Sequence, residues 1–173
     1  MNDPAAEQEK KFIRVDHAGE YGAARIYAGQ LAVLGGGPLA GMLREMQAQE
    51  QAHLAAFDTL IAERRVRPSL LLPLWNLAGF ALGAATAALG PRAAMACTVA
   101  VEETIDAHYA AQAAALPEEE GALKARIEAF RRDELEHRDI ALANGAAEAP
   151  GYRLMTAAIK AGCRAAIKLS ETL

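Results

Sequence analysis

The chain has 173 residues, enough for one domain with a buried core. Its 18 Lys and Arg against 22 Asp and Glu make it mildly acidic, and only 5% of its residues are aromatic, which argues against a nucleic-acid binder. Alanine is abundant and no stretch alternates apolar and polar residues, so we expect an all-α fold. Cys97 and Cys163 are predicted to be small buried residues rather than a disulfide or metal pair, which fits a reducing compartment.

Helix-breaking residues divide the chain into six predicted helices within a single domain, residues 1–173. Gly35 to Gly37 end the first helix, and Pro38 suits the first turn of the second. Later breaks fall at Pro68, at Gly90 with Pro91, at Pro117, and at Asn144 with Gly145. The expected helices span residues 6–34, 38–65, 69–90, 92–116, 118–144 and 151–171.

The segment 69–91 contains no charged residue. Its length would suffice to cross a bilayer core of ~30 Å. However, Pro73, Asn76, Gly79 and Gly83 interrupt it. Three interpretations are open: a membrane-spanning helix, a buried core helix, and an apolar segment that either faces a membrane or lines a tunnel. We favour the third.

The last predicted helix carries a basic stripe, because Lys160, Arg164 and Lys168 recur every four residues. Such a stripe could meet anionic lipid headgroups. A solvated helix face would have the same pattern, so both interpretations stay open.

The first pair of predicted helices presents a glutamate and a Glu-x-x-His motif. Glu20 precedes Glu50 by 30 residues, and His53 completes the motif. With a glycine turn near residue 36, an antiparallel hairpin has two arms of about 15 residues each, so both glutamates end at nearly the same height. Residues three apart on a helix share one face, so Glu50 and His53 point the same way.

The fourth and fifth predicted helices repeat this pattern. Glu102 precedes Glu134 by 32 residues, and His137 follows three residues later. Packed together, the two hairpins would offer the four carboxylates and two imidazoles of ferritin-like di-iron and di-manganese four-helix bundles. Carboxylates neutralise and bridge metal ions, and imidazole suits iron. Helix phase leaves Glu103 and Glu136 out of the predicted two-metal site, whose ligands are Glu20, Glu50, His53, Glu102, Glu134 and His137.

Several neighbouring polar residues have open roles. Asp133 and Gln49 directly precede the two motifs, and either could orient a ligand histidine. His108 and Tyr109 could line a substrate cavity or merely pack in the core. His17 is expected to be a surface histidine rather than a neighbour of the ligands.

Five stretches extend well beyond the candidate ligands: 13–34 with VDHAGEYGAARIYAGQ, 65–84, 95–109 with VEETIDAHY, 130–142 with DELEHRDIAL, and 161–171. They resemble the demethoxyubiquinone hydroxylases, the di-iron monooxygenases of ubiquinone biosynthesis, and the family's six iron ligands fall on the six residues above. The resemblance implies oxygen-dependent hydroxylation of 5-demethoxyubiquinol to 5-demethylubiquinol. It implies two Fe²⁺ ions, with NADH or the substrate quinol as electron source.

The same resemblance implies partners and a location. The substrate would be a benzoquinol with a polyprenyl tail, and the chain would bind a membrane surface peripherally. We expect the cytoplasmic face of a bacterial inner membrane, since MNDPAAEQEKK lacks an apolar signal core, or the mitochondrial inner membrane if a presequence has been removed. A homo-oligomer or a lipid-binding partner protein would be compatible with this family.

Two other functions remain possible from the sequence. A ferroxidase or iron-storage protein of the bacterioferritin type would carry nearly the same ligands, although the segment 69–91 would be awkward in a cage subunit. A non-catalytic membrane quinone-binding module would keep the metal for structure only. A dimanganese centre is a further alternative, because ligand type alone does not select the metal.

Overall fold

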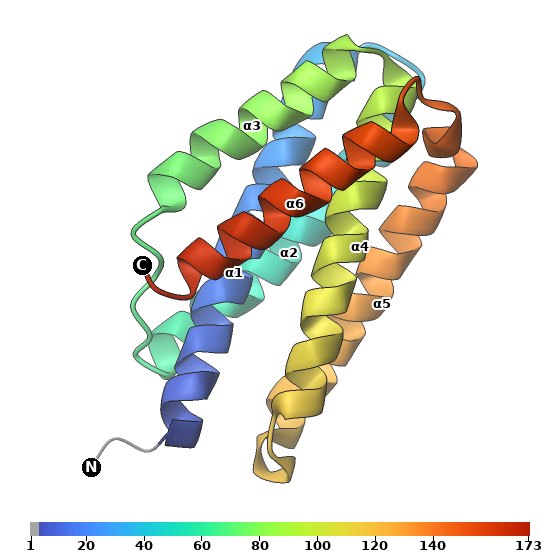
Figure 1. Ribbon diagram of the computed structural model, residues 1–173. Helices are drawn as coiled ribbons and strands as arrows, with labels where there is room; N and C mark the ends of the chain where they lie inside the picture. The colour runs from blue at the N-terminus through green and yellow to red at the C-terminus, as the bar shows by residue number, and fades with distance from the viewer. Residues whose placement is uncertain (1–3) are drawn as a thin grey trace. The chain divides into compact units, whose positions relative to one another are not determined.

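The computed structural model describes residues 4–173, and helices account for most of them. In chain order the α-helices are α1 (Pro4–Leu34), α2 (Ala40–Glu63), α3 (Leu72–Ala88), α4 (Pro91–Ala115), α5 (Gly121–Ala143) and α6 (Tyr152–Ser170) (Figure 1). Two short 3-10 helices, η1 (Glu118–Glu120) and η2 (Ala146–Glu148), precede α5 and α6. No strand occurs in the described residues, and the predicted all-α, ferritin-like fold class is confirmed.

The helix boundaries lie close to the predicted breaks, and the largest differences, of three residues, are at the starts of α3 and α5. For α3 the sequence predicts a start at residue 69, whereas the helix begins at Leu72 with Pro73 in its first turn. Proline suits that position because its missing N–H is not needed there. The preceding segment leaves α2 through Arg65, whose φ of 51° is left-handed and turns the chain out of the helix.

Contacts divide the described chain into two compact units. The first contains α1, α2 and α3 together with residues 165–173, and the second spans residues 92–164 with α4, α5 and most of α6. The prediction of one domain over residues 1–173 stays a prediction.

In the first unit, α1 packs against both α2 and α3 (Figure 1). Large side chains with at most 2% exposure fill this core: Ile13, Tyr27, Leu43, Met46 and Phe57. Such bulky buried groups interlock and leave few alternative packings.

Helix α3 approaches α1 so closely that glycine is required at the contact. A Cβ atom on Gly83 would lie 2.0 Å from the carbonyl oxygen of Ile26. One on Gly29 would lie 2.1 Å from the carbonyl oxygen of Phe80. Two of the residues that interrupt the apolar segment, Gly79 and Gly83, are therefore helix-packing positions.

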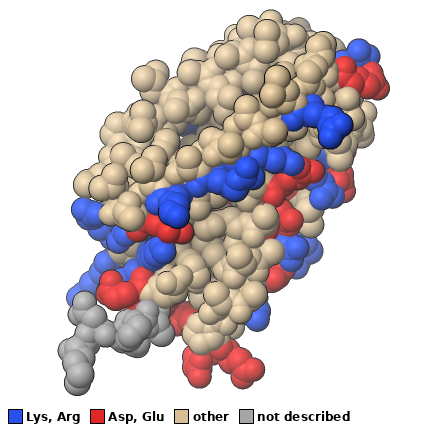
Figure 2. Space-filling model, viewed as in Figure 1, with Lys and Arg blue, Asp and Glu red and all other residues tan. Residues whose placement is uncertain are grey.

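The opposite side of α3 is exposed and apolar. Only Gly79, Gly83, Thr86 and Ala87 of this helix are buried. Exposed leucines on and beside the helix are Leu70, Leu74, Leu77 and Leu89, with exposures of 49–72%. Figure 2 shows the surface over α3 as a broad area without Lys, Arg, Asp or Glu. Among the described helices, none is both long and apolar enough to cross a membrane.

The C-terminal residues are anchored to the start of α3. The indole Nε1 of Trp75 donates to Ser170 Oγ at 3.0 Å, and the backbone N–H of Leu70 donates to the carbonyl oxygen of Leu173 at 2.9 Å. Lys11 of α1 pairs with Glu171 at 3.1 Å. These contacts explain why residues 165–173 belong to the first unit rather than to the second.

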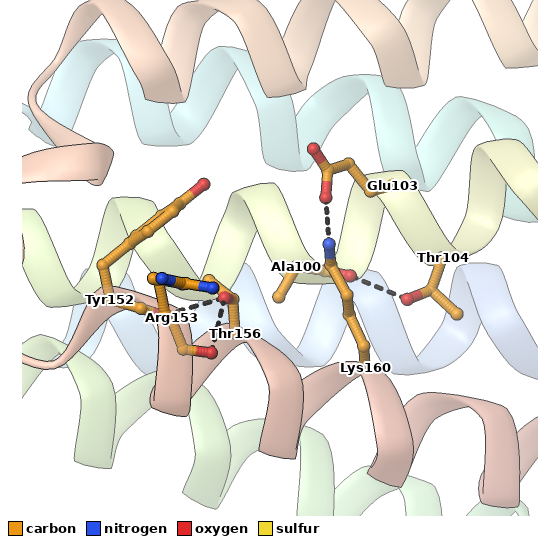
Figure 3. A network of polar contacts seen from close by, with 7 residues as sticks. All are labelled: Ala100, Glu103, Thr104, Tyr152, Arg153, Thr156 and Lys160. Atoms are coloured by element: carbon orange, nitrogen blue, oxygen red, sulfur yellow. Dashed lines mark hydrogen bonds and ion pairs between the residues drawn. The ribbon is translucent and has the colours of Figure 1, made fainter.

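In the second unit, α4 and α5 run antiparallel and are joined through Pro117 and η1 (Figure 1). Lys160 of α6 pairs with Glu103 of α4 (Figure 3). The three residues of the predicted basic stripe have different surroundings, because Lys160 is half-buried and paired while Arg164 and Lys168 are exposed.

Candidate metal centre

The first hairpin brings together three buried ligand residues. Glu20 lies on α1, and Glu50 and His53 lie on α2, with exposures of 1%, 0% and 3%. One ligand atom from each of the three lies within 4.8 Å of the others. Nδ1 of His53 is 3.4 Å from Oε2 of Glu20, so the contact joins the two helices. We call these residues the first ligand set.

The second hairpin brings together the corresponding three residues. Glu102 lies on α4, and Glu134 and His137 lie on α5, with exposures of 1%, 0% and 0%. One ligand atom from each again lies within 4.8 Å of the others. Nδ1 of His137 is 3.7 Å from Oε2 of Glu134, one turn away on the same helix. These residues form the second ligand set.

Each set has the composition and burial of a metal site. Two carboxylates held this close in a buried place repel each other, and removing each from water is costly. A divalent cation between them compensates both effects. Carboxylate with imidazole is a donor mixture that suits iron, manganese and zinc. The residues of each set therefore fit a metal ion.

The other residues considered from the sequence have varied surroundings. Asp133 is half-buried and Gln49 is exposed. Tyr109 is buried, and the amide nitrogen of Gln112 lies 2.7 Å from Nε2 of His108. Roles in orienting a ligand or lining a cavity stay predictions for these residues.

His17 is not a surface residue, so that expectation was wrong. It is 5% exposed, and its Nε2 lies 2.9 Å from Oδ1 of Asp58. His17 precedes Glu20 by one turn of α1 and shares its helix face, which is directed into the core rather than to solvent. Asp58 on α2 then provides the polar partner that a buried imidazole needs.

Sequence reasoning missed an ion pair between α4 and α5. Nε of Arg131 donates to Oδ1 of Asp106 at 2.6 Å, and this hydrogen bond raises the pKa of Arg131 above its ordinary value. The spacing contained the signal. Asp106 follows Glu102 by four residues and Arg131 precedes Glu134 by three, so an antiparallel hairpin brings them to one height.

Both cysteines are free, as predicted, and both lie in the second unit. Cys97 is fully buried and Cys163 is partly so. Burial raises the pKa of the Cys163 thiol to about 11, and the negative charge of Glu102 adds to the rise. The Cys163 side chain is therefore a neutral thiol close to the second ligand set.

Helical hairpins that each carry a buried glutamate and a Glu-x-x-His motif define a class, the ferritin-like carboxylate metalloproteins. A comparison with known families narrows this class. Residues 7–170 match the family described as ubiquinone biosynthesis protein COQ7, and the chain belongs to that family. This finding confirms the resemblance recognised from the sequence.

Named relatives cover nearly the whole chain. The chain is 60% identical over 162 residues to the 3-demethoxyubiquinol 3-hydroxylase of Rhodospirillum rubrum, covering 93% of this chain and 76% of the relative. It is 54% identical to a Homo sapiens relative named NADPH-dependent 3-demethoxyubiquinone 3-hydroxylase, mitochondrial, over 94% of this chain and 77% of that one. It is 43% identical to the 5-demethoxyubiquinone hydroxylase, mitochondrial, of Saccharomyces cerevisiae, over 100% of this chain and 82% of that one.

Proposed function

We propose that this chain is the oxygen-dependent hydroxylase of a demethoxyubiquinol intermediate in ubiquinone biosynthesis, working at a two-iron centre. The observation that carries the proposal is the pair of buried Glu–Glu–His sets in a chain whose relatives are named as hydroxylases of this ring. The enzyme class follows from the family. We further propose that the metal is iron and that the six residues bind it.

The six residues would hold both metal ions. Four carboxylates offset the four positive charges of two divalent ions, so the two imidazoles bind as neutral donors. Bound iron would supply the activation of dioxygen. All six residues are at most 3% exposed, so the protein keeps bulk water away from the reaction and holds the ligands in place. A buried site also strengthens the attraction between carboxylates and cations.

The overall reaction needs electrons from outside the ligand sets. One oxygen atom of dioxygen enters the ring C–H bond, and the other leaves as water after taking up two electrons and two protons. A reduced nicotinamide is the donor that we favour, because the human relative is named as NADPH-dependent. NADH would serve the same chemistry, and oxidation of the substrate quinol itself is the alternative.

We also place the protein on a membrane surface as a peripheral protein. A polyprenyl quinol resides in lipid, so the enzyme must meet its substrate at a bilayer. The exposed leucines of α3, together with Leu169 and Leu173, are candidates for the contact. The relative from Rhodospirillum rubrum makes the bacterial inner membrane our first choice of location, and the relatives named as mitochondrial give the alternative. A homo-oligomer or a lipid-binding partner protein could bring substrate to this face.

Membrane binding is testable with vesicles of phosphatidylglycerol and phosphatidylcholine. Leu74→Asp with Leu77→Asp is expected to abolish cosedimentation with these vesicles, because a charge at the membrane contact opposes insertion. Leu142→Asp is the control, since Leu142 is also an exposed leucine but lies on α5. Equal binding by both variants would rule out α3 as the contact.

A single turnover tests the reaction. The protein is loaded anaerobically with Fe²⁺, its iron content is measured, a demethoxyubiquinol is added in lipid, and ¹⁸O-labelled dioxygen is admitted. One labelled oxygen atom on the ring is the expected result. Iron oxidation without labelled product would instead support the ferroxidase function, and a cage of about two dozen subunits on a sizing column would support storage. Product formation by an iron-free Glu134→Ala variant would make the metal structural.

A further inference from the structure

Helix α4 has a smooth buried surface around its metal ligand. The residues before Glu102 are mostly small. Those with no detectable exposure are Ala94, Ala96, Cys97 and Ala100, together with the larger Met95 and Val99. Helices pack by fitting ridges of side chains into grooves. Small side chains make shallow ridges, so apolar packing alone specifies the rotation and height of α4 weakly.

Apolar packing also specifies the position of α5 only weakly at the level of the second ligand set. Between Ile127 and Ala141, the only fully buried side chains of α5 are Glu134 and His137. Without metal, the nearby carboxylates of Glu102 and Glu134 repel each other. Contacts other than apolar packing must therefore keep α4 and α5 aligned before the metal arrives.

Two ion pairs on α4 supply such contacts. Asp106, one turn after the ligand, accepts the 2.6 Å hydrogen bond from Arg131 of α5. Oε2 of Glu128, one turn earlier on α5, lies 3.5 Å from Nη1 of the same guanidinium. Glu103, the residue next to the ligand, pairs with Lys160 of α6. Figure 3 shows the lysine side chain of α6 reaching toward the glutamate on α4.

These pairs differ from ordinary surface salt bridges in what they connect. All four side chains are between 22% and 36% exposed, so solvent screens them only in part. Both connect α4 to another helix within four residues of Glu102. Sliding or rotating α4 by one residue would break both contacts.

We propose that Asp106, Arg131, Glu103 and Lys160 are positioning residues that hold Glu102 at the height and rotation that metal binding by the second ligand set requires. The pairs act through the ligand and do not touch the metal. This inference rests on the proposed function, because it assumes that Glu102, Glu134 and His137 bind a metal ion.

The test measures the affinity of the purified full chain for Co²⁺, by competition with a chelator and by the visible absorption of the bound ion. Asp106→Asn and Arg131→Gln are each expected to weaken binding by about tenfold, as loss of a group that orients a ligand does. The charge-exchanged pair Asp106→Arg with Arg131→Asp is expected to recover most of this loss. Lys160→Met tests the second pair, with a smaller expected reduction.

Glu148→Gln is the matched control. It removes a pair between α4 and η2, Arg92 with Glu148 at 2.8 Å, whose side chains are more than 60% exposed and lie ten residues or more from Glu102. This variant should bind Co²⁺ as the unaltered chain does. A purely structural role for Asp106 and Arg131 would lower the unfolding midpoint equally with and without metal, leaving Co²⁺ affinity unchanged, and that result would overturn the inference.

The outcomes also separate this inference from the proposed function. If the unaltered chain bound no metal and formed no product, the proposed function would fail. If it bound metal and hydroxylated the quinol while Asp106→Asn bound Co²⁺ equally well, only the positioning role would fail. Should the single variants not fold, the charge-exchanged pair decides: a folded protein with weak Co²⁺ binding contradicts the inference, and near-normal binding supports it.

Discussion

The two hairpins carry the same ligand pattern but are supported differently. In the first, α1 and α2 share a core of large side chains such as Tyr27 and Phe57, and α3 packs on α1 backbone to backbone. In the second, the buried face of α4 is mostly small residues, with Met95 and Tyr109 as larger exceptions, and ion pairs connect α4 to α5 and α6. The same ligand pattern is therefore supported mainly by interlocking apolar packing in one hairpin. In the other, polar contacts between helices add to the packing of small side chains.

The ligand contacts show a related difference. In the first set, Nδ1 of His53 lies 3.4 Å from Oε2 of Glu20 on another helix. In the second set, Glu134 and His137 belong to one helix. Helix geometry alone holds the second pair together, so the open question in that hairpin is where Glu102 of α4 lies. The predictions that follow test this contrast.

The largest effect is expected from removing one ligand of each set. Glu50→Gln and Glu134→Gln should each lower metal affinity by more than the about 10–100-fold that loss of an orienting neighbour costs, because a charged donor is lost. Iron per chain and labelled product are the measurements, with Gln51→Ala, a change at an exposed neighbour of Glu50, as the control. If either variant retained full iron and activity, that hairpin would not contribute to the centre.

Truncating a buried side chain should lower the free energy of unfolding more in the first hairpin than in the second. Phe57→Ala in α2 is expected to cost about 3–5 kcal/mol, because a fully buried ring leaves a cavity. Val99→Ala in α4 should cost about 1–2 kcal/mol, since only two buried carbons are lost. Urea unfolding of the metal-free proteins measures both. Equal costs would remove the distinction between bulky and smooth packing.

Because α3 approaches α1 so closely, we expect the stability of the protein to fall when a methyl group is added at Gly83. Gly83→Ala is expected to destabilise the protein by about 1–3 kcal/mol, because its Cβ would meet a backbone oxygen that cannot move alone. Gly162→Ala in α6 is the matched change, since nothing lies within 4 Å of its Cβ position. This control should stabilise the protein by about 0.5–1 kcal/mol through helix propensity. If Gly83→Ala left the free energy of unfolding unchanged, the contact between α1 and α3 would have room for a methyl group.

The mildest test concerns Cys163 and changes no residue of the chain. Burial raises the pKa of its thiol from 9.0 to about 11, so the thiolate is scarce at pH 8. Alkylation by iodoacetamide should be about 100-fold slower in the folded chain than in urea. The stability linked to this raised pKa is complete below pH 9 and is lost as the pH rises toward 11. Mass spectrometry of Cys163 measures the rate, and fast reaction at pH 8 would show that the second unit opens readily.

Much of this protein could be predicted from local patterns. Glycine and proline breaks located all six helices within a few residues, and the hairpin spacing predicted which Glu and His residues each hairpin brings together. These predictions succeed because helix periodicity and turn chemistry depend on residues close in sequence. The expectation for His17 failed because the polar partner of its imidazole, Asp58, lies 41 residues away in the sequence.

The sequence by itself determined the helices, the turns and the three residues that each hairpin buries together, because rise per residue and helix phase follow from local geometry. Only the tertiary structure decided which side chains support them. The glycine contacts between α1 and α3, the docking of Leu173 beside Leu70, and the pairs at Asp106 and Glu103 each join distant segments. Such contacts depend on side-chain shape and charge across a packed interface, which no local period encodes.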